Sequence, residues 1–429
     1  MTQTVGPRTA PVPTAARIGG PDAVLTEEQV RAFIHDQLAA ADLDGRSVCV
    51  LVPDGTRSCP LPLLLGAVHG ALHGRVTRLT VLIALGTHAQ MGETELAGHL
   101  GYPARAIAER YPGTTVLNHE WWDAATFASV GTIGADRLSE LSGGRFHQAV
   151  DVRLNRAVVE HDVTLVVGPV FPHEVVGFSG GNKYFFPGVS GQEVINVSHW
   201  LGALITSAEI IGTRGTTPVR ALIDEAVSLV PGDKLALCVV VASGTGALHA
   251  ATFGEPQAAW AAAADVSAET HVRYLDAPVR RVLSLVSTKY HDMWTAAKGF
   301  YKVEPVVADG GQVVVYAPHV REISATHPEV EEIGYHCRDY FVQQWDRFRG
   351  VPWGVLAHST HLRGSGTYDE SVGESCRVTV TLATGIPEEQ VRAVNLDYLD
   401  PAEVDADAWA GDPGTLVVPQ AGEVLFRLR

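Results

Sequence analysis

Cysteine is scarce in this chain, and its distribution gives none of the familiar metal or disulfide motifs. The 429 residues include five cysteines, which are scattered and odd in number and form no CxxC pair. Such a pattern is typical of a reducing environment and carries no zinc or iron–sulfur signature. We therefore expect a cytoplasmic protein in which soft metal ligands come from histidine or from a cofactor.

Long apolar runs and excess positive charge are also missing. Hydrophobic residues make up 46% of the chain, yet no apolar run approaches the length that crosses a membrane. The net charge of −16 argues against nucleic acid or an anionic membrane as partner, although a small anionic substrate could bind where cationic groups converge. Residues 1–20 lack an apolar core behind their few basic residues. We therefore expect a disordered leader there rather than a signal peptide.

The length and the alternation of strands with helices predict two α/β domains. A chain of 429 residues exceeds one typical core. β-Branched runs alternate with helical segments, which indicates mostly parallel, Rossmann-like sheets. We place an N-terminal α/β domain at residues 21–277 and a C-terminal α/β domain at residues 278–429. The expected strands include 46–53, 79–85, 114–117, 163–170, 235–242, 281–287, 312–317, 378–382, 391–394 and 415–418.

Polar side chains follow four of the strands expected in the first half. Open α/β sheets bind ligands beyond the carboxyl ends of their strands. Residues that are distant in sequence can therefore share one rim of the sheet. The four side chains expected to do so are Arg57, His88, His119 and His173.

A glycine-rich turn that ends on a lysine follows the strand at 163–170. Pro172-His173 precede the turn, which runs from Gly177 to Lys183, and a helix expected after Pro187-Gly188 carries His199. Glycines let a backbone approach an anion, a buried lysine can hold a covalent cofactor, and histidine serves as acid, base or metal ligand. A structural turn with a surface lysine and two core histidines is the alternative. The spacing excludes a GxxxxGK[ST] phosphate loop.

The pattern PHxxxGFSGGxKxxxPG, with a histidine sixteen residues after its lysine, resembles the signature of the lactate racemase family. The resemblance implies a nickel-pincer nucleotide, pyridinium-3,5-bisthiocarboxylic acid mononucleotide with nickel, made by separate cofactor biosynthesis proteins. It implies that Lys183 is the covalent tether, His199 the nickel ligand and His173 a catalytic acid/base. The turn residues Ser179, Gly180 and Gly181 would bind the cofactor.

Two further strand ends resemble segments of the same family. Asp54-Gly55-Thr56-Arg57 is similar to its D-x-T-R segment. There the arginine would pair with a substrate carboxylate through its planar fork, and Asp54, Gly55 and Thr56 would bind the cofactor or fix the loop. The alternative is an Asp-Gly turn with a solvated arginine.

Gly86-Thr87-His88 matches the family's G-T-H, which supplies the second catalytic histidine, and Lys298 resembles a lysine that reaches the reacting centre. Ala89 stands where the family usually has arginine, so lactate itself is in doubt as the substrate. Trp294 and Lys289 are weaker candidates, and His319, His358 and His361 could line the second half of a cleft. We expect His119, Trp121 and Trp122 to serve in packing.

The resemblance implies a racemase or epimerase of a small anionic 2-hydroxy acid in a cleft between the two domains. The cofactor would take and return a hydride, while two histidines move the hydroxyl proton. One alternative is a zinc-type hydrolase or lyase that uses the histidines, which would require three protein ligands. Another is a non-catalytic ligand- or cofactor-binding homologue. A homo-oligomer is compatible with the sequence.

Overall fold

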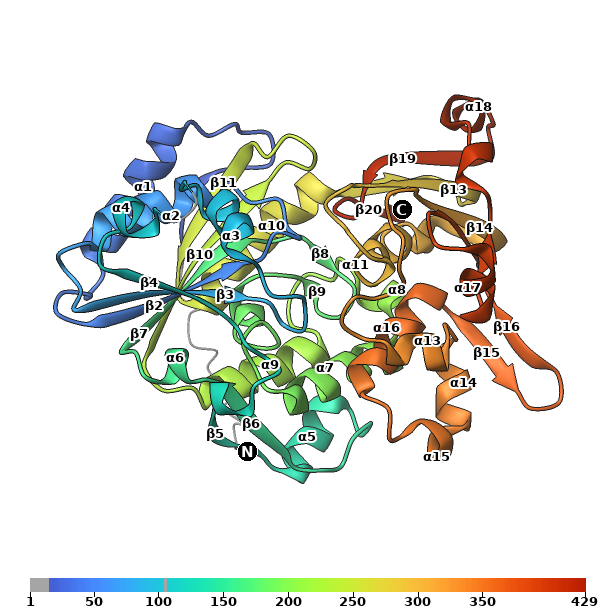
Figure 1. Cartoon of the computed structure of the whole chain (residues 1–429), viewed down its shortest axis with the longest axis horizontal. Helices are drawn as coiled ribbons and strands as arrows, with labels where there is room; N and C mark the ends of the chain where they lie inside the picture. Colours follow the sequence, from blue (N-terminus) through green and yellow to red (C-terminus); the bar gives the residue numbers. More distant parts are fainter. Residues whose placement is uncertain (1–14, 104–105) are drawn as a thin grey trace, which may run out of the picture.

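The structure, a computed structural model, describes residues 15–103 and 106–429. Within these residues, one large sheet lies in the first half of the chain and a second sheet in the second half (Figure 1). The prediction of an α/β fold with mostly parallel sheets is confirmed. The division into two domains near residue 277 stays a prediction.

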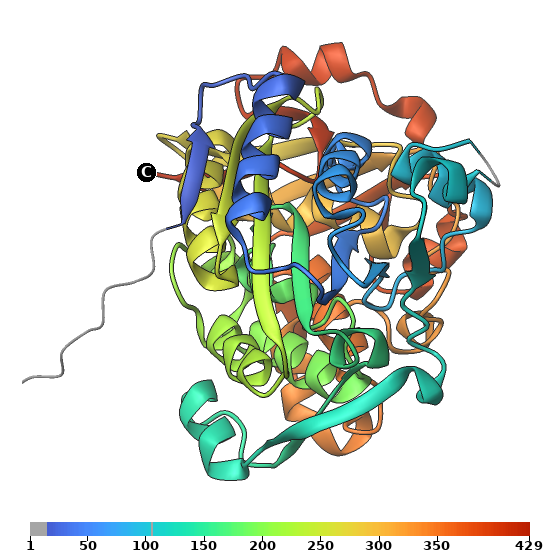
Figure 2. The same cartoon turned by 90° about the vertical axis from the view of Figure 1, so that its left-hand side faces the viewer.

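The first sheet has seven strands in the order β1-β11-β10-β7-β2-β3-β4. The five strands from β10 to β4 run parallel, and β11 and β1 add an antiparallel edge. Figure 2 shows β1 at this edge, beside the yellow-green strands. The strands are β1 (Ala16–Gly19), β2 (Ser47–Pro53), β3 (Arg78–Ala84), β4 (Thr114–Asn118), β7 (Val163–Pro169), β10 (Asp233–Val241) and β11 (Leu248–Gly254).

Helices cover both faces of this sheet, which explains its continuous apolar strands. Alternate side chains of β2 and β7 enter two separate hydrophobic clusters, one with α1 to α3 and one with α7, α9 and α10. Figure 1 shows α1 and α2 above the sheet and α7 and α9 below it. The helices are α1 (Glu27–Ala40), α2 (Leu61–Leu72), α3 (Glu93–Leu100), α4 (Ile107–Arg110), α7 (Gln192–Ile205), α8 (Ser207–Ile210), α9 (Pro218–Ser228) and α10 (Pro256–His271).

The second sheet has five parallel strands in the order β18-β17-β14-β13-β19. Its strands are β13 (Val279–Val286), β14 (Val307–Ala317), β17 (Thr379–Thr384), β18 (Asp397–Tyr398) and β19 (Thr415–Ala421). The helices of this half are α11 (Met293–Ala296), α12 (Lys298–Tyr301), α13 (Glu329–Ile333), α14 (Arg338–Gln343), α15 (Trp345–Phe348), α16 (Trp353–Arg363), α17 (Glu388–Ala393) and α18 (Ala406–Ala410).

Short strand pairs complete the fold. β12 (Val272–Leu275) pairs in parallel with β20 (Leu425–Leu428), so the end of the chain returns to the segment that joins the two sheets. The remaining pairs are β5 (Phe127–Ile133) with β6 (Val150–Asn155), β8 (Pro172–His173) with β9 (Gly177–Phe178), and β15 (Gly366–Asp369) with β16 (Gly373–Cys376). Short helices α5 (Ala135–Ser142) and α6 (Arg156–Val159) flank β6.

Several local predictions are wrong. Residues 1–14 of the expected disordered leader lie outside the described residues, but Ala16–Gly19 form β1 because β11 offers them an open edge. The expected strand at 391–394 falls largely within α17, since its apolar pair Val391 and Val394 has helical spacing. Strand β11 was not expected.

A capping box opens α1: Gln29 donates its backbone N–H to Thr26 Oγ1, and Thr26 N–H donates to Gln29 Oε1. The predicted bounds of three strands are confirmed. Strands β2, β3 and β7 lie within one residue of their expected bounds. Within residues 15–103 and 106–429, no helix is long and apolar enough to cross a membrane.

Candidate active site

A cavity of about 390 Å³ lies between the two halves of the chain. Its wall comes from the loops that follow β2, β3 and β7, from α7, and from α12 and α16 of the second half. The expected crevice at the carboxyl ends of the strands is therefore present. The predicted site residues that line it are Asp54, Thr56, Arg57, His88, His173, Ser179, Gly180, Lys183, His199 and Lys298, together with the further candidates Trp294, His358 and His361.

The loop after β2 places a carboxylate against the first histidine. Asp54 Oδ1 accepts hydrogen bonds from the backbone N–H of Thr56 at 3.1 Å and from its hydroxyl at 2.6 Å, which closes a tight turn. Oδ2 of Asp54 lies 2.5 Å from His88 Nδ1. Burial opposes the charged form, but the charge and hydrogen bond of His88, with Thr56 and Arg57, lower the pKa of Asp54 below its ordinary value. Gly55 lies at the exposed tip of this loop, outside the wall.

An ionised Asp54 determines the tautomer of His88. Since a carboxylate only accepts hydrogen bonds, the proton of the neutral imidazole lies on Nδ1, and Nε2 keeps its lone pair. The indole N–H of Trp121 donates to the backbone oxygen of His88 at 2.9 Å, which fixes the loop from the other side. His88 is thus held as a hydrogen-bond acceptor at Nε2.

The second histidine has the opposite arrangement. His173 is 5% exposed, and its Nδ1 accepts the backbone N–H of Val175 at 3.1 Å, so the proton of the neutral ring lies on Nε2. Burial, followed by the charges of Lys183 and Arg57, holds the pKa of His173 well below its ordinary value. A carboxylate oxygen of Glu174 lies 3.4 Å from the same Nδ1. This carboxylate can accept the Nδ1 proton of the other tautomer.

The glycine turn is held by a buried arginine. Gly180 and Gly181 have φ of +86° and +58°, conformations that favour glycine, and a side chain at 181 would meet Trp260 at 2.7 Å. Gly181 therefore packs against Trp260 rather than lining the cavity. Arg220 donates to the carbonyl oxygen of Phe178 at 2.6 Å, and its guanidinium carbon lies 3.6 Å from the Trp260 ring centre. These contacts fix the backbone from which Lys183 projects.

Lys183 and Lys298 have lowered pKa values. Burial, followed by the charge of Arg57, lowers the pKa of Lys183 to about 7, although Glu174 acts in the opposite direction. The same two causes lower the pKa of Lys298 to about 8. A neutral amine at Lys183 can act as a nucleophile near neutral pH. The arrangement therefore favours the covalent interpretation of the turn over a solvated lysine.

Two imidazoles of the cavity have nitrogen atoms suited to a metal. His199 Nδ1 lies 2.8 Å from the carbonyl oxygen of Ile195, which assigns the proton to Nδ1 and leaves the lone pair on Nε2. Burial and the charge of Lys183 lower the pKa of His199 to about 4. His361, on α16, is 4% exposed, and neither ring nitrogen has a hydrogen-bond partner. A buried imidazole without partners indicates a site built for a ligand.

An aromatic wall closes the cavity on the side of the second half. Trp294 stacks between two histidines, with ring centres 4.2 Å from His327 and 3.8 Å from His358. Trp121 stacks on the other side of His327 at 5.9 Å. His327 Nε2 lies 2.9 Å from the hydroxyl of Thr87, which joins this wall to the loop that carries His88. The role of Trp121 therefore extends beyond the packing that was expected.

Several candidates lie outside the cavity. His119 is fully buried and contacts the carbonyl oxygen of Ser190 at 3.4 Å, so it packs under the sheet as expected. Lys289 forms an ion pair with Glu423 at 2.7 Å. Ala89 is exposed and does not line the wall. His319 contacts the carbonyl oxygen of Tyr290 at 3.1 Å.

Glu174 and Tyr301 line the cavity but were not predicted from the sequence. Burial opposes the charge of Glu174, but Lys298 and other cations lower its pKa, and its carboxylate hydrogen-bonds to Tyr301. Two features of the sequence could have indicated them. Glu174 is a charged residue next to His173, and Tyr301 is an aromatic residue three positions after Lys298, which is one helical turn.

The fold and the cavity define an α/β protein whose site lies beyond the ends of parallel strands, with a lysine-bearing glycine turn in its wall. Residues 26–211 match the family described as the lactate racemase N-terminal domain. This match confirms the resemblance of the signature to the lactate racemase family over the first half of the chain.

Two known proteins resemble this chain over different shares of its length. A lactate racemase from Thermoanaerobacterium thermosaccharolyticum is 25% identical over 158 residues, which are 36% of this chain and 32% of that protein. The match thus spans about a third of this curated relative. A crystal structure of a Thermotoga maritima protein matches with a TM-score of 0.87 at 30% identity, over 96% of this chain and all 100% of that one.

The lactate racemase apoprotein of Thermoanaerobacterium thermosaccharolyticum has the same fold. It matches with a TM-score of 0.67 at 17% identity, over 96% of this chain and 100% of that chain. At this identity the match shows the fold alone.

Proposed function

We propose that this protein is a racemase or epimerase of a small 2-hydroxy acid that works with a nickel-pincer nucleotide bound covalently to Lys183. One observation carries the proposal: a lysine with a pKa of about 7 shares a cavity wall with His88 and His173. The pairing of a nucleophilic amine with two imidazoles suits a tethered cofactor and proton transfer. The match of residues 26–211 to the lactate racemase N-terminal domain supports it.

The residues of the cavity fit this cofactor. A neutral amine at Lys183 is the form that can be acylated. The Nε2 atom of His199 is available as the nickel ligand. The partnerless His361 lies in the same wall and offers two more nitrogen atoms. When bound, the nucleotide would accept a hydride from C2 of the substrate and return it.

Cations of the wall suit an anionic substrate. Arg57 and Lys298 lie in the cavity beside the two histidines. The planar guanidinium of Arg57 can hold a carboxylate through two hydrogen bonds. Its contacts with Thr56, at 3.3 Å to the carbonyl oxygen and 3.4 Å to the hydroxyl, orient it along the loop. Lys298 would contact the substrate's oxygen atoms from the second half.

The two histidines have complementary neutral forms. His88 accepts a proton at Nε2, and the carboxylate of Asp54 stabilises the imidazolium that results. His173 presents an N–H at Nε2 and can exchange tautomers with Glu174 as the alternative acceptor. One histidine would therefore take the hydroxyl proton while the other supports the opposite face of the substrate.

The zinc alternative lacks a three-ligand site in this cavity. Among the residues that the structure describes, the group of three with metal-ligating atoms within 4.8 Å of one another is Cys337, Glu374 and Cys376, and none of these lines the cavity. Zinc catalysis requires three protein ligands and a water. The other alternative, a non-catalytic ligand- or cofactor-binding homologue, predicts no turnover in the test below.

The test is turnover of a panel of enantiopure 2-hydroxy acids in D₂O, with protein produced together with the cofactor biosynthesis proteins. We expect inversion at C2 with retention of the C2 hydrogen, since a hydride that is held and returned does not exchange with solvent. Lys183→Arg, which keeps the charge but cannot carry the cofactor, should be inactive. Solvent deuterium at C2, or full activity of Lys183→Arg, would overturn the proposal.

A further inference from the structure

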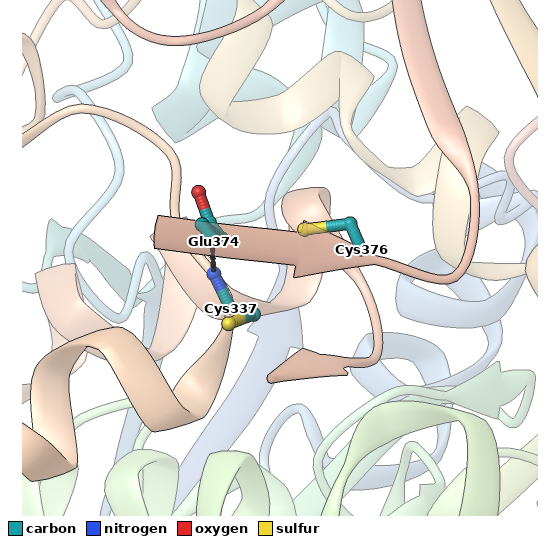
Figure 3. Close-up of side chains that lie close together, drawn as sticks. All are labelled: Cys337, Glu374 and Cys376. Carbon is teal, nitrogen blue, oxygen red and sulfur yellow. Dashed lines mark hydrogen bonds between the residues drawn. The ribbon is translucent and has the colours of Figure 1, made fainter. Parts of the chain in front are cut away.

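Two cysteines and a glutamate meet at the β15–β16 hairpin of the second half (Figure 3). The sulfur atoms of Cys337 and Cys376 and a carboxylate oxygen of Glu374 all lie within 4.8 Å of one another. None of these residues lines the cavity described above. The cluster is therefore separate from the candidate active site.

The backbone builds this cluster from two distant segments. Glu374 and Cys376 are two positions apart on β16, so their side chains leave the same face of the strand. Cys337 directly precedes α14 and is fully buried. Gly366 of β15 pairs with Cys376, and a side chain at 366 would lie 3.0 Å from Cys337 Cβ and 2.8 Å from the carbonyl oxygen of Ser375. Glycine at this position lets the cysteines approach.

Neighbouring donors hold Glu374 as an oriented carboxylate. Its Oε2 contacts His336 Nδ1 at 3.0 Å and accepts from Asn395 Nδ2 at 2.9 Å, while Oε1 accepts the backbone N–H of Cys337 at 2.5 Å. These three contacts fix the orientation of the carboxylate beside the two cysteines.

We propose that Cys337, Glu374 and Cys376 bind one zinc ion, which ties the β15–β16 hairpin to the start of α14. Two thiolates and a carboxylate are ligands that zinc accepts in a four-coordinate site. A groove of about 470 Å³ is lined by Glu374 and Cys376, and it gives water access to the fourth position. His336 and Asn395 contact the Glu374 carboxylate and orient it, as residues that hydrogen-bond to a metal ligand commonly do.

The charges of the cluster suit a divalent ion. Two thiolates and one carboxylate carry three negative charges, and zinc with the adjacent Arg363 balances them. The ion would also brace the active-site wall, because the backbone N–H of His336 donates to Ser359 Oγ at 3.0 Å. Ser359 lies on α16, the helix that carries His358 and His361. The proposal does not depend on the proposed racemase activity.

The test measures zinc bound by the full chain, produced without cofactor biosynthesis proteins, reduced, stripped of metal and titrated with zinc alone. We expect one tightly bound zinc per chain, and its loss in Cys337→Ser and Cys376→Ser. Glu374→Gln removes a proposed ligand, so it should weaken binding by more than the roughly 10- to 100-fold that loss of a ligand's supporting group costs. Cys59→Ser, a half-buried thiol outside the cluster, is the matched control and should bind as the parent does.

A spectroscopic measurement guards against variants that fail to fold. Cobalt(II) bound to the unaltered chain should give the intense near-ultraviolet absorption of cobalt–thiolate bonds. Absence of that absorption would overturn the proposal. Zinc that stays bound at full stoichiometry when Cys337→Ser and Cys376→Ser are combined would also overturn it, because the metal would then lie among the cavity histidines. A Cys337–Cys376 disulfide that forms in place of metal binding would equally contradict it.

Discussion

Nδ1 of His88 lies 2.5 Å from Oδ2 of Asp54, and the same carboxylate closes the turn that carries Arg57. One buried acid thus orients a proton-transfer group and a substrate-binding group together. The family resemblance implied that Asp54 binds the cofactor or fixes the loop. Its contacts with His88 and Thr56 support the second role and extend it to the histidine.

Asp54→Asn should slow turnover sharply and leave binding nearly unchanged. The amide can accept the Nδ1 proton of His88 but cannot stabilise the imidazolium, so we expect kcat to fall by about 10²- to 10⁴-fold. The measurement is kcat and KM for the best hydroxy acid across pH. Asp400→Asn, the same change at an exposed cap of a short helix far along the chain, is the control. A rise in KM with kcat unchanged would refute this role for the Asp54–His88 pair.

In cofactor-free protein, Lys183 should react with an acylating reagent near neutral pH. Burial and Arg57 lower its pKa from 10.5 to about 7, so the reactive neutral fraction grows as pH rises through about 7 and is complete well below pH 10. Peptide mapping of labelling rates against pH measures this. Arg57→Gln removes a like charge, raises the pKa of Lys183 and should slow its labelling at pH 7. A rate that keeps rising up to pH 10 would count against the lowered pKa.

Arg220→Met should destabilise the fold by about 1–3 kcal/mol, because it leaves the buried carbonyl oxygen of Phe178 without its charged donor. The free energy of unfolding in urea is the measurement. Arg214→Met is the matched control: that side chain is half exposed and 3.9 Å from Asp265, a surface pair worth under about 1 kcal/mol. Equal effects of the two substitutions would mean that Arg220 does not hold the glycine turn.

Trp294→Ala should change which hydroxy acids are used. The indole lies between His327 and His358 in the cavity wall, and its removal widens the site by most of a ring. We expect kcat/KM to fall for the smallest substrates, which lose contacts, and to fall less or rise for those with bulky C3 substituents. Trp122→Ala, an exposed indole outside the wall, should change neither. Uniform losses for all substrates would argue for a structural role.

The sequence could predict the first half of the site because its residues follow buried strands. Arg57, His88 and His173 come directly after β2, β3 and β7, and the parallel sheet brings such positions to one edge. His119 has the same placement after β4, yet it points into the core, where it meets Ser190. Position after a strand selects the edge of the sheet but not the direction of the side chain.

The site residues in the second half of the chain were harder to predict from the sequence, because their positions depend on packing between distant segments. His361 was named only as one of three histidines that could line the cleft, and its place in the wall follows from the packing of α16 against α7. Arg220 reaches the glycine turn across 40 residues, which no local pattern indicates. Strand β1 exists because β11 pairs with it, a tertiary effect that local composition cannot carry.

The most direct measurement of the central claim is the intact mass and nickel content of the chain after production with the cofactor biosynthesis proteins, followed by peptide mapping. The proposal predicts one nucleotide adduct on Lys183 and one nickel lost with it in Lys183→Arg, while Lys298→Arg keeps both. A chain that racemises a 2-hydroxy acid with Lys183 unmodified would contradict it.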